Sequence, residues 1–262
     1  MAATFSKYTE LKRTSRCEKH GAYEEIGTML SILNRTIWYG CNRCGTELRT
    51  AEESRRSAEF ERNRQHRIEQ RLKIAGIPRR FIDRNFHSFF ADTKEKLFAL
   101  KIASDFAANF AENSNDGNSL IFSGRHGTGK THLAVAVGLA VMVHSTVIYV
   151  NALDLIRMVR DTWRRGSPLT ELDVLNDLSS VGLLIVDEVG VQYGTEGEKV
   201  ILFDVINRRY RDSKPMILLT NLNRDGMKDF LGDRSFDRLR EIGTWVIFDW
   251  TSYRGANRRG QS

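Results

Sequence analysis

The stretch GRHGTGKT, residues 124–131, follows a strand-like run at residues 119–123 and opens a helical one at residues 131–141. Glycines permit backbone conformations that point successive N–H groups into one concave surface, and a helix N-terminus adds partial positive charge there. A lysine followed by a hydroxyl residue then adds a point charge and an oxygen ligand. This order of strand, loop and helix predicts a phosphate-binding P-loop in an α/β domain.

The chemistry of ATP assigns a role to each residue of this loop. Lys130 is expected to contact the β- and γ-phosphates, and the Thr131 hydroxyl is expected to ligate Mg²⁺. Backbone amides of residues 127–129 supply the anion cradle. The predicted cofactor-binding residues of the loop are Gly124, Gly127, Thr128, Gly129, Lys130 and Thr131. The alternative is a glycine-rich turn that binds nothing.

Two acids and an asparagine follow later strand-like runs. The stretch GLLIVDE ends in Asp187 and Glu188, and Asn221 follows the run LLT. Open α/β sheets bind their ligands at the carboxyl ends of the strands. We expect Asp187 to hold Mg²⁺ and Glu188 to orient the attacking water, a pairing that favours hydrolysis over binding alone. Asn221 is expected to sense the γ-phosphate or position the water, unless it merely caps a turn.

Alternating apolar and amphipathic stretches predict the fold of residues 81–262. Helical patterns occupy residues 130–144, 153–164, 198–211 and 235–241. Strands separated by helical crossovers form largely parallel sheets that are covered on both faces. The expected strands of this mainly parallel five-stranded sheet are residues 119–123, 146–150, 183–187, 216–220 and 244–248.

All three cysteines of the chain lie in residues 1–48. Cys17-Glu-Lys-His20 and Cys41-Asn-Arg-Cys44 form two pairs, each with a two-residue gap. Two such pairs can complete a tetrahedron around one ion, and three thiolates with an imidazole suit Zn²⁺. We therefore predict a small zinc-knuckle domain whose metal is structural. The alternative is a set of unligated, reduced thiols.

Residues 49–80 carry dense charge of both signs and predict an exposed helical linker. The whole chain has a net charge of +7, which favours polyanionic partners. Its first residues lack the apolar segment of a secretory signal, and no apolar run approaches the ~20 residues of a membrane span. We expect a cytoplasmic protein without a membrane partner.

Several stretches from residue 76 onward resemble the AAA+ ATPases and, within them, the DnaC-type replicative helicase loaders. They are GIPRRFIDRNFHSF, FSGRHGTGKTHLA, VLNDLSSVGLLIVDEVGVQ, LLTN, GDRSFDRLR and WVIFDWTSYR. The resemblance implies an arginine finger in GDRSFDRLR that acts on the nucleotide of a neighbouring subunit. Arg238 is the first choice for it and Arg234 the second. It further implies that Arg254 contacts the nucleotide.

The resemblance also implies partners. Such loaders bind the hexameric replicative helicase, self-associate through their AAA+ domains and deliver the helicase to single-stranded DNA, with ATP hydrolysis driving release. Arg157, Arg160 and Arg164 lie at helical spacing within residues 152–178, the region that helps form a single-strand surface in loaders. The zinc module is then expected to dock the helicase, a feature that the best-known loaders need not have.

Two other functions are compatible with the same motifs. One is a transposition helper ATPase of the IstB type, which acts on duplex DNA together with a transposase. The FDWTSYR stretch and the zinc module favour the loader instead. The other is an adaptor that binds nucleotide without hydrolysing it. Asp187, Glu188 and Asn221 count against that adaptor.

Overall fold

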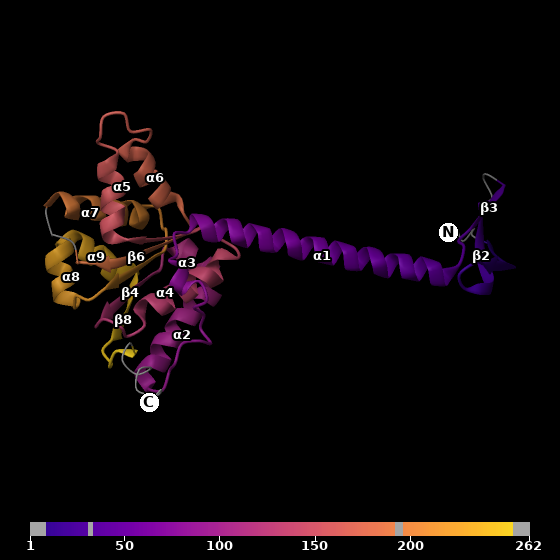
Figure 1. Cartoon of the computed structure of the whole chain (residues 1–262), viewed down its shortest axis with the longest axis horizontal. Helices are drawn as coiled ribbons and strands as arrows, with labels where there is room; N and C mark the ends of the chain where they lie inside the picture. The colour runs from indigo at the N-terminus through magenta and orange to yellow at the C-terminus, as the bar shows by residue number, and fades with distance from the viewer. Residues whose placement is uncertain (1–8, 31–33, 192–195, 254–262) are drawn as a thin grey trace, which may run out of the picture. The chain divides into compact units, whose positions relative to one another are not determined.

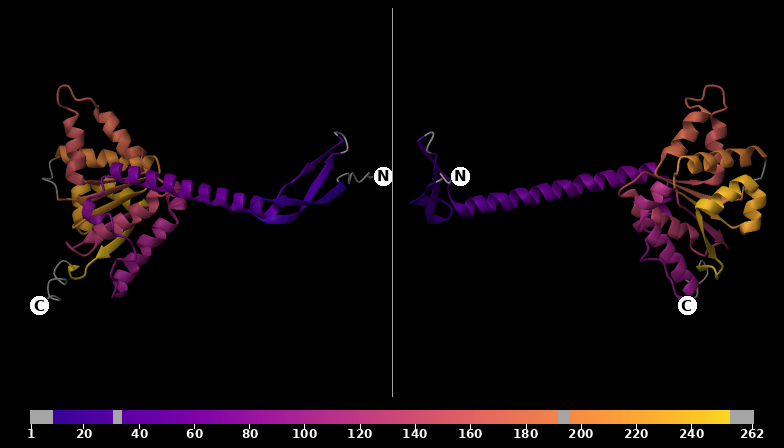
Figure 2. Two further views of the ribbon diagram at one scale, coloured as in Figure 1. Left: turned by 45° about the vertical axis from the view of Figure 1, so that its right-hand side comes forward. Right: turned by 180° about the vertical axis from the view of Figure 1, so that it is seen from behind.

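The computed structural model describes residues 9–30, 34–191 and 196–253 of the 262-residue chain. It contains two compact units, residues 1–67 and residues 68–262. Figures 1 and 2 show the elements of both units, and each unit is considered by itself below. None of the described helices combines the length and the apolar content that a bilayer span requires.

The first unit contains a small antiparallel sheet. Its strands are β1 (Thr9–Cys17), β2 (Gly21–Leu30) and β3 (Arg35–Trp38), paired in the order β1-β2-β3. On one face, the Arg13 guanidinium lies 4.0 Å from the centre of the Trp38 ring and its Nε donates to Glu25 at 2.7 Å. The sequence did not indicate β1 and β2 because charged residues occur on both of their faces, and β3 has only four residues.

Helix α1 (Asn42–Ile74) begins in the first unit and ends in the second. It is the charged helix predicted for residues 49–80, but it begins within the second cysteine pair, so that Cys44 lies in its first turn. Ion pairs between residues three or four apart stabilise such an exposed helix only weakly. The predicted boundary at residue 48 therefore falls inside a continuous helix.

The second unit is built on a five-stranded parallel sheet, which confirms the predicted fold class. The strands are β4 (Ser119–Gly124), β5 (Val147–Asn151), β6 (Leu183–Val189), β7 (Met216–Thr220) and β8 (Gly243–Phe248). They pair in the order β5-β6-β7-β4-β8. Most side chains of the three central strands are buried, as expected for a sheet covered on both faces.

Helices pack on both faces of this sheet (Figure 1). One apolar cluster joins the sheet to α5 (Ala152–Asp161), α6 (Glu171–Ser180), α7 (Glu196–Arg211), α8 (Arg224–Leu231) and α9 (Asp233–Ile242). The other joins the opposite face to α2 (Lys94–Ala108), α3 (Phe110–Asp116) and α4 (Lys130–Met142). A short 3₁₀ helix, η1 (Arg79–Phe81), lies between α1 and α2.

The region of residues 152–178 is not a single helix. Two helices, α5 and α6, are separated by a loop that contains Gly166 and Pro168. Gly166 has a φ of 87°, which a helix interior does not accommodate, and Pro168 cannot donate a helical hydrogen bond. Arg164 consequently lies beyond the end of α5, not on the same helical face as Arg157 and Arg160.

A fully buried arginine fastens α7 to the loop between α6 and β6. Arg209 is 0% exposed, and within the described residues its guanidinium has no carboxylate partner. Its guanidinium instead donates to main-chain carbonyls at 2.5 to 3.4 Å. The acceptors are the carbonyls of Leu178, Ser179, Val181, Gly182 and Pro215.

Replacing Arg209 should therefore cost far more than replacing an exposed arginine. Arg209→Met keeps much of the volume but leaves several buried carbonyls without donors, and we expect a loss of about 3–5 kcal/mol in the free energy of unfolding. Arg211→Met, on the exposed side of the same helix, should change it by less than about 0.5 kcal/mol. Urea denaturation of both variants measures the difference, and equal losses would contradict this role of Arg209.

Candidate functional site

The P-loop joins β4 to α4 and has the backbone conformation that its glycines predict. Gly127 and Gly129 have φ values of 75° and 99°, in the left-handed region. A Cβ atom on Gly129 would lie 2.7 Å from the Phe89 ring, so no larger residue fits without displacement. On the other side, the Trp250 indole N–H donates to the Thr128 carbonyl at 2.9 Å. The loop is thus held by aromatic residues from two distant segments.

Lys130 lies folded across the loop. Its side-chain Nζ donates to the carbonyls of Gly124 and Arg125 at 2.6 and 2.8 Å and to Asn221 Oδ1 at 2.9 Å. Only 8% of the residue is exposed. Asn221, at the tip of β7, therefore meets the P-loop lysine directly, as its position after a strand suggested. An incoming phosphate would offer this ammonium group a charged acceptor in place of neutral ones.

Asp187 is fully engaged by hydrogen bonds at the tip of β6. Its Oδ2 accepts from the Thr131 hydroxyl at 2.9 Å and from the Tyr149 hydroxyl at 2.6 Å. Its Oδ1 accepts from the backbone N–H of Glu188 at 2.7 Å. The hydroxyl and the carboxylate expected at Mg²⁺ are therefore in direct contact. Hard oxygen ligands of this kind fit Mg²⁺ well.

Glu188 occupies a strained backbone position. Its φ is 59°, in the left-handed region, and the β6–β7 register shifts between Val186 and Val189. This irregularity turns the Glu188 carboxylate toward the neighbouring strand β5, where Oε2 accepts a hydrogen bond from the Asn151 amide. Non-glycine residues in such conformations cluster at functional sites. Sequence reasoning did not identify Asn151.

One cavity of about 330 Å³ brings these groups together. Its walls include Lys130, Thr131, Asp187, Glu188 and Asn221, which the sequence predicted from three separate segments. A second part of the wall comes from the segment before α2 and from the segment after β8, and its role was not predicted. Its residues include Arg80, Phe81, Arg84, Phe89, Phe90 and Trp250. The aromatic content of residues 81–90 was the available signal. Aromatic and cationic walls of this kind suit a nucleobase and its phosphates.

The predicted finger arginines lie on α9, away from this cavity. Arg238 is half-buried and donates to Asn207 Oδ1, with its guanidinium 5.4 Å from the centre of the Tyr210 ring. Arg234 is exposed, and within the described part of the chain it has no ion pair. Arg254 falls outside the described residues.

The arginines predicted to bind single-stranded DNA come together on α5 and on the turn that follows it. Arg157, Arg160 and Arg164 line one shallow hollow with Trp163, whose side chain is 59% exposed. Arg157 and Arg164 pair with Asp154 and Asp161 on the same segment. Arg160 differs, because it lies 3.6 Å from the buried carboxylate of Glu198 on α7.

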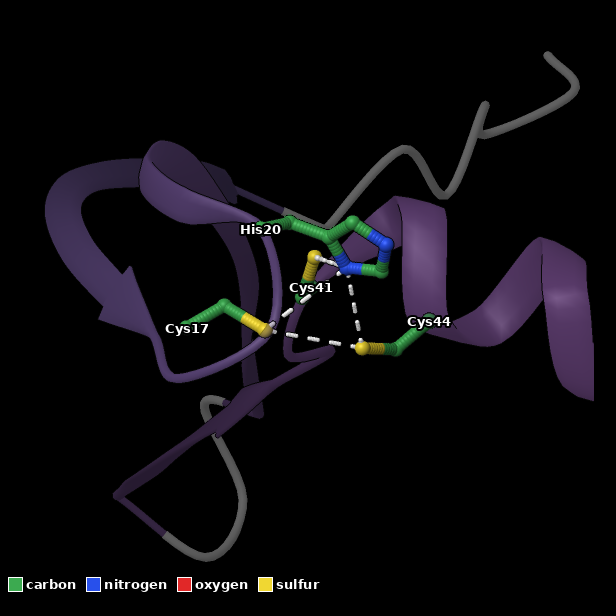
Figure 3. A group of neighbouring side chains, drawn as sticks. All are labelled: Cys17, His20, Cys41 and Cys44. Carbon is green, nitrogen blue, oxygen red and sulfur yellow. Dashed lines mark hydrogen bonds between the residues drawn. The ribbon is translucent and has the colours of Figure 1, made fainter.

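The four predicted zinc ligands converge in the first unit (Figure 3). Cys17 Sγ lies 3.5 Å from Cys44 Sγ, and His20 Nδ1 lies 3.8, 3.6 and 3.3 Å from the sulfurs of Cys17, Cys41 and Cys44. Tetrahedral ligands at zinc bond lengths would be about 3.5–3.8 Å apart. The donor set and spacing therefore fit Zn²⁺.

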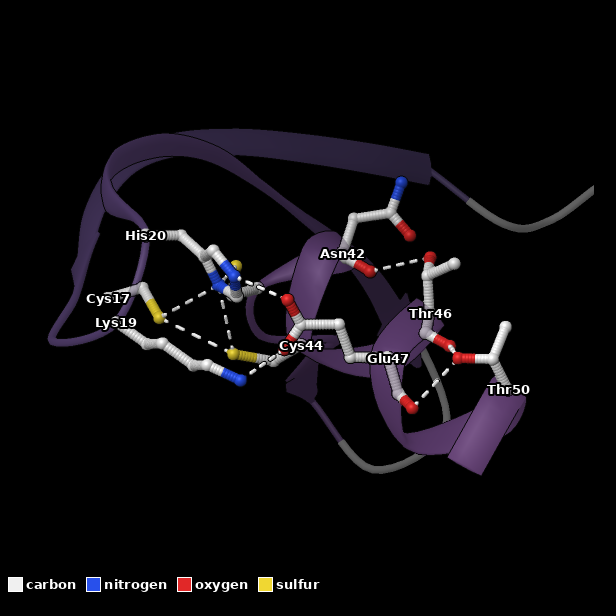
Figure 4. Close-up of polar contacts among 9 residues, drawn as sticks. Cys17, Lys19, His20, Asn42, Cys44, Thr46, Glu47 and Thr50 are labelled. Atoms are coloured by element: carbon white, nitrogen blue, oxygen red, sulfur yellow. Dashed lines mark hydrogen bonds and ion pairs between the residues drawn. The ribbon is translucent and has the colours of Figure 1, made fainter. Parts of the chain in front are cut away.

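Second-sphere contacts orient the histidine of this cluster (Figure 4). His20 Nε2 lies 2.9 Å from Glu47 Oε1, which leaves Nδ1 facing the sulfurs, and Lys19 Nζ lies 2.5 Å from Glu47 Oε2. Hydrogen bonds from the backbone of His20 and Lys19 lower the pKa of the Cys17 thiol to about 6. A carboxylate behind a histidine is the usual support of a zinc ligand.

Glu47→Ala should therefore weaken metal binding without removing a ligand. We expect the affinity for Zn²⁺ to fall about 10-fold to 100-fold, because His20 loses its orienting partner. Competition with a chromogenic chelator measures the affinity. Glu24→Ala removes a carboxylate that pairs with Lys12 elsewhere in the same unit and should leave the affinity unchanged. Equal affinities in all three proteins would contradict the support by Glu47.

Comparison with known proteins identifies the family to which the chain belongs. A family profile described as IstB-like ATP binding protein matches residues 55–259. It covers the P-loop and the strand-tip acids, whereas the cysteine–histidine cluster precedes it.

Individual relatives agree with this match. The replicative helicase loader DnaC of Escherichia coli (strain K12) is 38% identical over 205 residues, which is 76% of this chain and 81% of that protein. DnaC of Buchnera aphidicola subsp. Schizaphis graminum is 36% identical over 208 residues, 78% of this chain and 83% of that protein. A crystal structure of the DnaC helicase loader shares the fold, with a TM-score of 0.59 at 22% identity over 65% of this chain and 99% of that one. The chain therefore belongs to the IstB-like ATP-binding family of AAA+ proteins, together with the DnaC helicase loaders.

Proposed function

We propose that this protein is an ATP-dependent loader of the replicative helicase. It would bind the hexameric helicase, deliver it to single-stranded DNA and release it when ATP is hydrolysed. The observation that carries the proposal is the cavity in which Lys130 and Thr131 meet Asp187, Glu188 and Asn221, in a chain 38% identical to a named helicase loader.

The residues of the cavity have different roles in ATP hydrolysis. Lys130 and the amides of residues 127–129 hold the phosphates, while Thr131 and Asp187 hold Mg²⁺. Bound Mg²⁺ neutralises charge on the β- and γ-phosphates. Glu188 orients and polarises the attacking water, and it must leave Asn151 to do so. Asn221 positions the γ-phosphate or the water. Arg254 lies outside the described residues, and its proposed contact with the nucleotide rests on the family resemblance alone.

A second copy of the chain completes the site in this proposal. A cation supplied in trans stabilises charge on the transferring phosphoryl group. Arg238 is our first choice for this finger, and its contact with Asn207 and the Tyr210 ring would fix its direction. Arg234 is the second choice, supported by its exposure. Either assignment requires self-association through the AAA+ domain.

The segments before the AAA+ domain supply the helicase contact in this proposal. Residues 1–48 would form the zinc-binding docking domain, residues 49–80 the charged linker and residues 81–262 the ATPase. The distances among Cys17, His20, Cys41 and Cys44 support a structural Zn²⁺. This module precedes residue 55, where the match to the family profile begins, and in this proposal it determines the choice of partner.

The arginine hollow on α5 supports contact with single-stranded DNA. Arg157, Arg160 and Arg164 would bind phosphates while Trp163 stacks on a base. Because every one of these arginines already lies beside an acid, DNA must displace those acids to bind. This competition favours weak, salt-sensitive binding over tight binding.

A transposition helper of the IstB type is the second candidate, because the matching family profile carries that name. Such a protein would act on duplex DNA with a transposase. A nucleotide-bound adaptor without turnover is the third possibility. A preference for duplex DNA would favour the helper, and absence of turnover with helicase and single-stranded DNA would favour the adaptor.

Two substitutions separate nucleotide binding from hydrolysis. Lys130→Ala should weaken ATP binding about 10-fold to 100-fold, because a charged phosphate contact is lost. Glu188→Gln should keep ATP binding but slow hydrolysis by about 100-fold or more. Lys101→Ala, an exposed lysine on α2, is the control and should change neither quantity.

The same variants test the loader itself through co-purification with a hexameric replicative helicase. Wild-type protein should be retained by the helicase and released after ATP and single-stranded DNA are added. Glu188→Gln should be retained but fail to leave. If wild-type protein is not retained at all, the loader proposal is wrong.

DNA binding is tested most cleanly at Arg157 and Arg164, because both pair with exposed acids of their own segment. Arg160 is left intact, since its loss would strip a partner from buried Glu198. The double change to Gln should weaken binding to single-stranded DNA and reduce the slope of log K against log salt by about 1.4. Arg211→Gln is the control. An unchanged slope would remove this surface from the proposal.

A further inference from the structure

Tyr149 lies on the edge strand of the parallel sheet, one strand away from Asp187. Strand β5 pairs with β6 on one side, and Tyr149 stands opposite Ile185 in that register. On its other side, the backbone N–H of Tyr149 donates to the carbonyl of Ala75 at 2.7 Å. The side chain reaches across the tip of β6, and its hydroxyl donates to Asp187 Oδ2 at 2.6 Å.

The hydroxyl is held as a hydrogen-bond donor by its surroundings. The Tyr149 hydroxyl lies 2.6 Å from Asp187 Oδ2, and an ionised carboxylate can only accept a hydrogen bond. The phenol is therefore the donor of this bond. The bond to a charged acceptor is short and belongs to the stronger class of hydrogen bonds in proteins.

The other contacts of Asp187 indicate what the Tyr149 hydroxyl does. Oδ1 is occupied by the backbone N–H of Glu188, which is fixed by the chain itself. Oδ2 is shared between two hydroxyls, those of Thr131 and Tyr149. Thr131 belongs to the P-loop and faces the nucleotide cavity, whereas Tyr149 is not part of the cavity wall. Tyr149 therefore supports the carboxylate from behind and can act only through Asp187.

The backbone of Tyr149 is itself fixed by the end of α1. Gly76 has a φ of 68°, and a Cβ atom there would lie 2.6 Å from the Tyr149 carbonyl oxygen. One turn earlier, Arg71 Nη1 donates to the carbonyls of Met142 and Val143 at the end of α4. The same short segment thus holds both β5 and the helix that starts with Lys130.

We infer that Tyr149 is a positioning residue for the magnesium site, which fixes the Asp187 carboxylate beside the Thr131 hydroxyl, where the two residues would hold Mg²⁺. The inference rests on the proposed function only in that the cavity must take a nucleotide with Mg²⁺. Second-sphere partners of metal ligands raise metal affinity in this way. A phenol that merely filled space would leave the affinity for Mg²⁺ untouched when its oxygen is removed.

Tyr149→Phe removes the oxygen and keeps the ring, so the packing of β5 is preserved. Binding of fluorescent ADP is measured first in EDTA and then across a Mg²⁺ titration. We expect the Mg²⁺ concentration that gives half of the affinity increase to rise about 10-fold, while the affinity in EDTA changes by less than about 2-fold. Tyr39→Phe, which removes a hydroxyl that contacts Thr28 in the first unit, should match the wild type in both measurements.

The outcomes distinguish the positioning role of Tyr149 from the proposed ATP hydrolysis. An unchanged Mg²⁺ midpoint in Tyr149→Phe would overturn the inference, as would equal losses with and without Mg²⁺, which indicate general damage to the site. Wild-type protein that binds ADP without any response to Mg²⁺ would also overturn it. Wild-type protein that binds nucleotide with Mg²⁺ but shows no turnover would refute the proposed hydrolysis and leave the inference supported by the binding data.

Discussion

Two hydrogen bonds join the P-loop to the tips of neighbouring strands, and the candidate site depends on them. Thr131 Oγ1 donates to Asp187 Oδ2, and Lys130 Nζ donates to Asn221 Oδ1, each at 2.9 Å. They are possible because β6, β7 and β4 are adjacent and parallel, so their carboxyl ends meet at one edge. Remote segments support this edge from outside: Phe89 and Trp250 hold the loop, and Tyr149 holds Asp187.

Three charged side chains of the candidate nucleotide and DNA sites already have hydrogen-bond or ion-pair partners. A bound nucleotide or DNA strand must replace these partners. Lys130 is satisfied by neutral carbonyls, Glu188 by Asn151, and Arg160 by the carboxylate of Glu198. Each of these contacts lowers the free-energy cost of holding the charged side chain in the site before a ligand binds. Each also implies that binding is an exchange of partners. In the cysteine–histidine cluster, by contrast, the four candidate ligand atoms already lie within 4.8 Å of one another, as a structural metal site would require.

The sequence predicted the sheet well because its strands are short, apolar and buried. All five predicted strands begin within one residue of the observed ones, and the P-loop helix begins at the predicted Lys130. Prediction failed where the signal was polar or interrupted. The strands β1 and β2 carry charge on both faces, and helical spacing grouped Arg164 with Arg157 and Arg160 although α5 ends at Asp161. Tyr149 and Asn151 escaped notice because their roles arise from strand pairing, which no local pattern of residues contains.

The central claim is that one cavity binds ATP between the P-loop and the strand-tip acids. A crystal structure of the protein with Mg²⁺ and a non-hydrolysable ATP analogue tests it most directly. The account predicts phosphates along the amides of residues 127–131, with Lys130 Nζ moved from Asn221 onto the phosphate oxygens and the cation beside Thr131 and Asp187. Phosphates bound elsewhere, or a cation distant from Asp187, would contradict it.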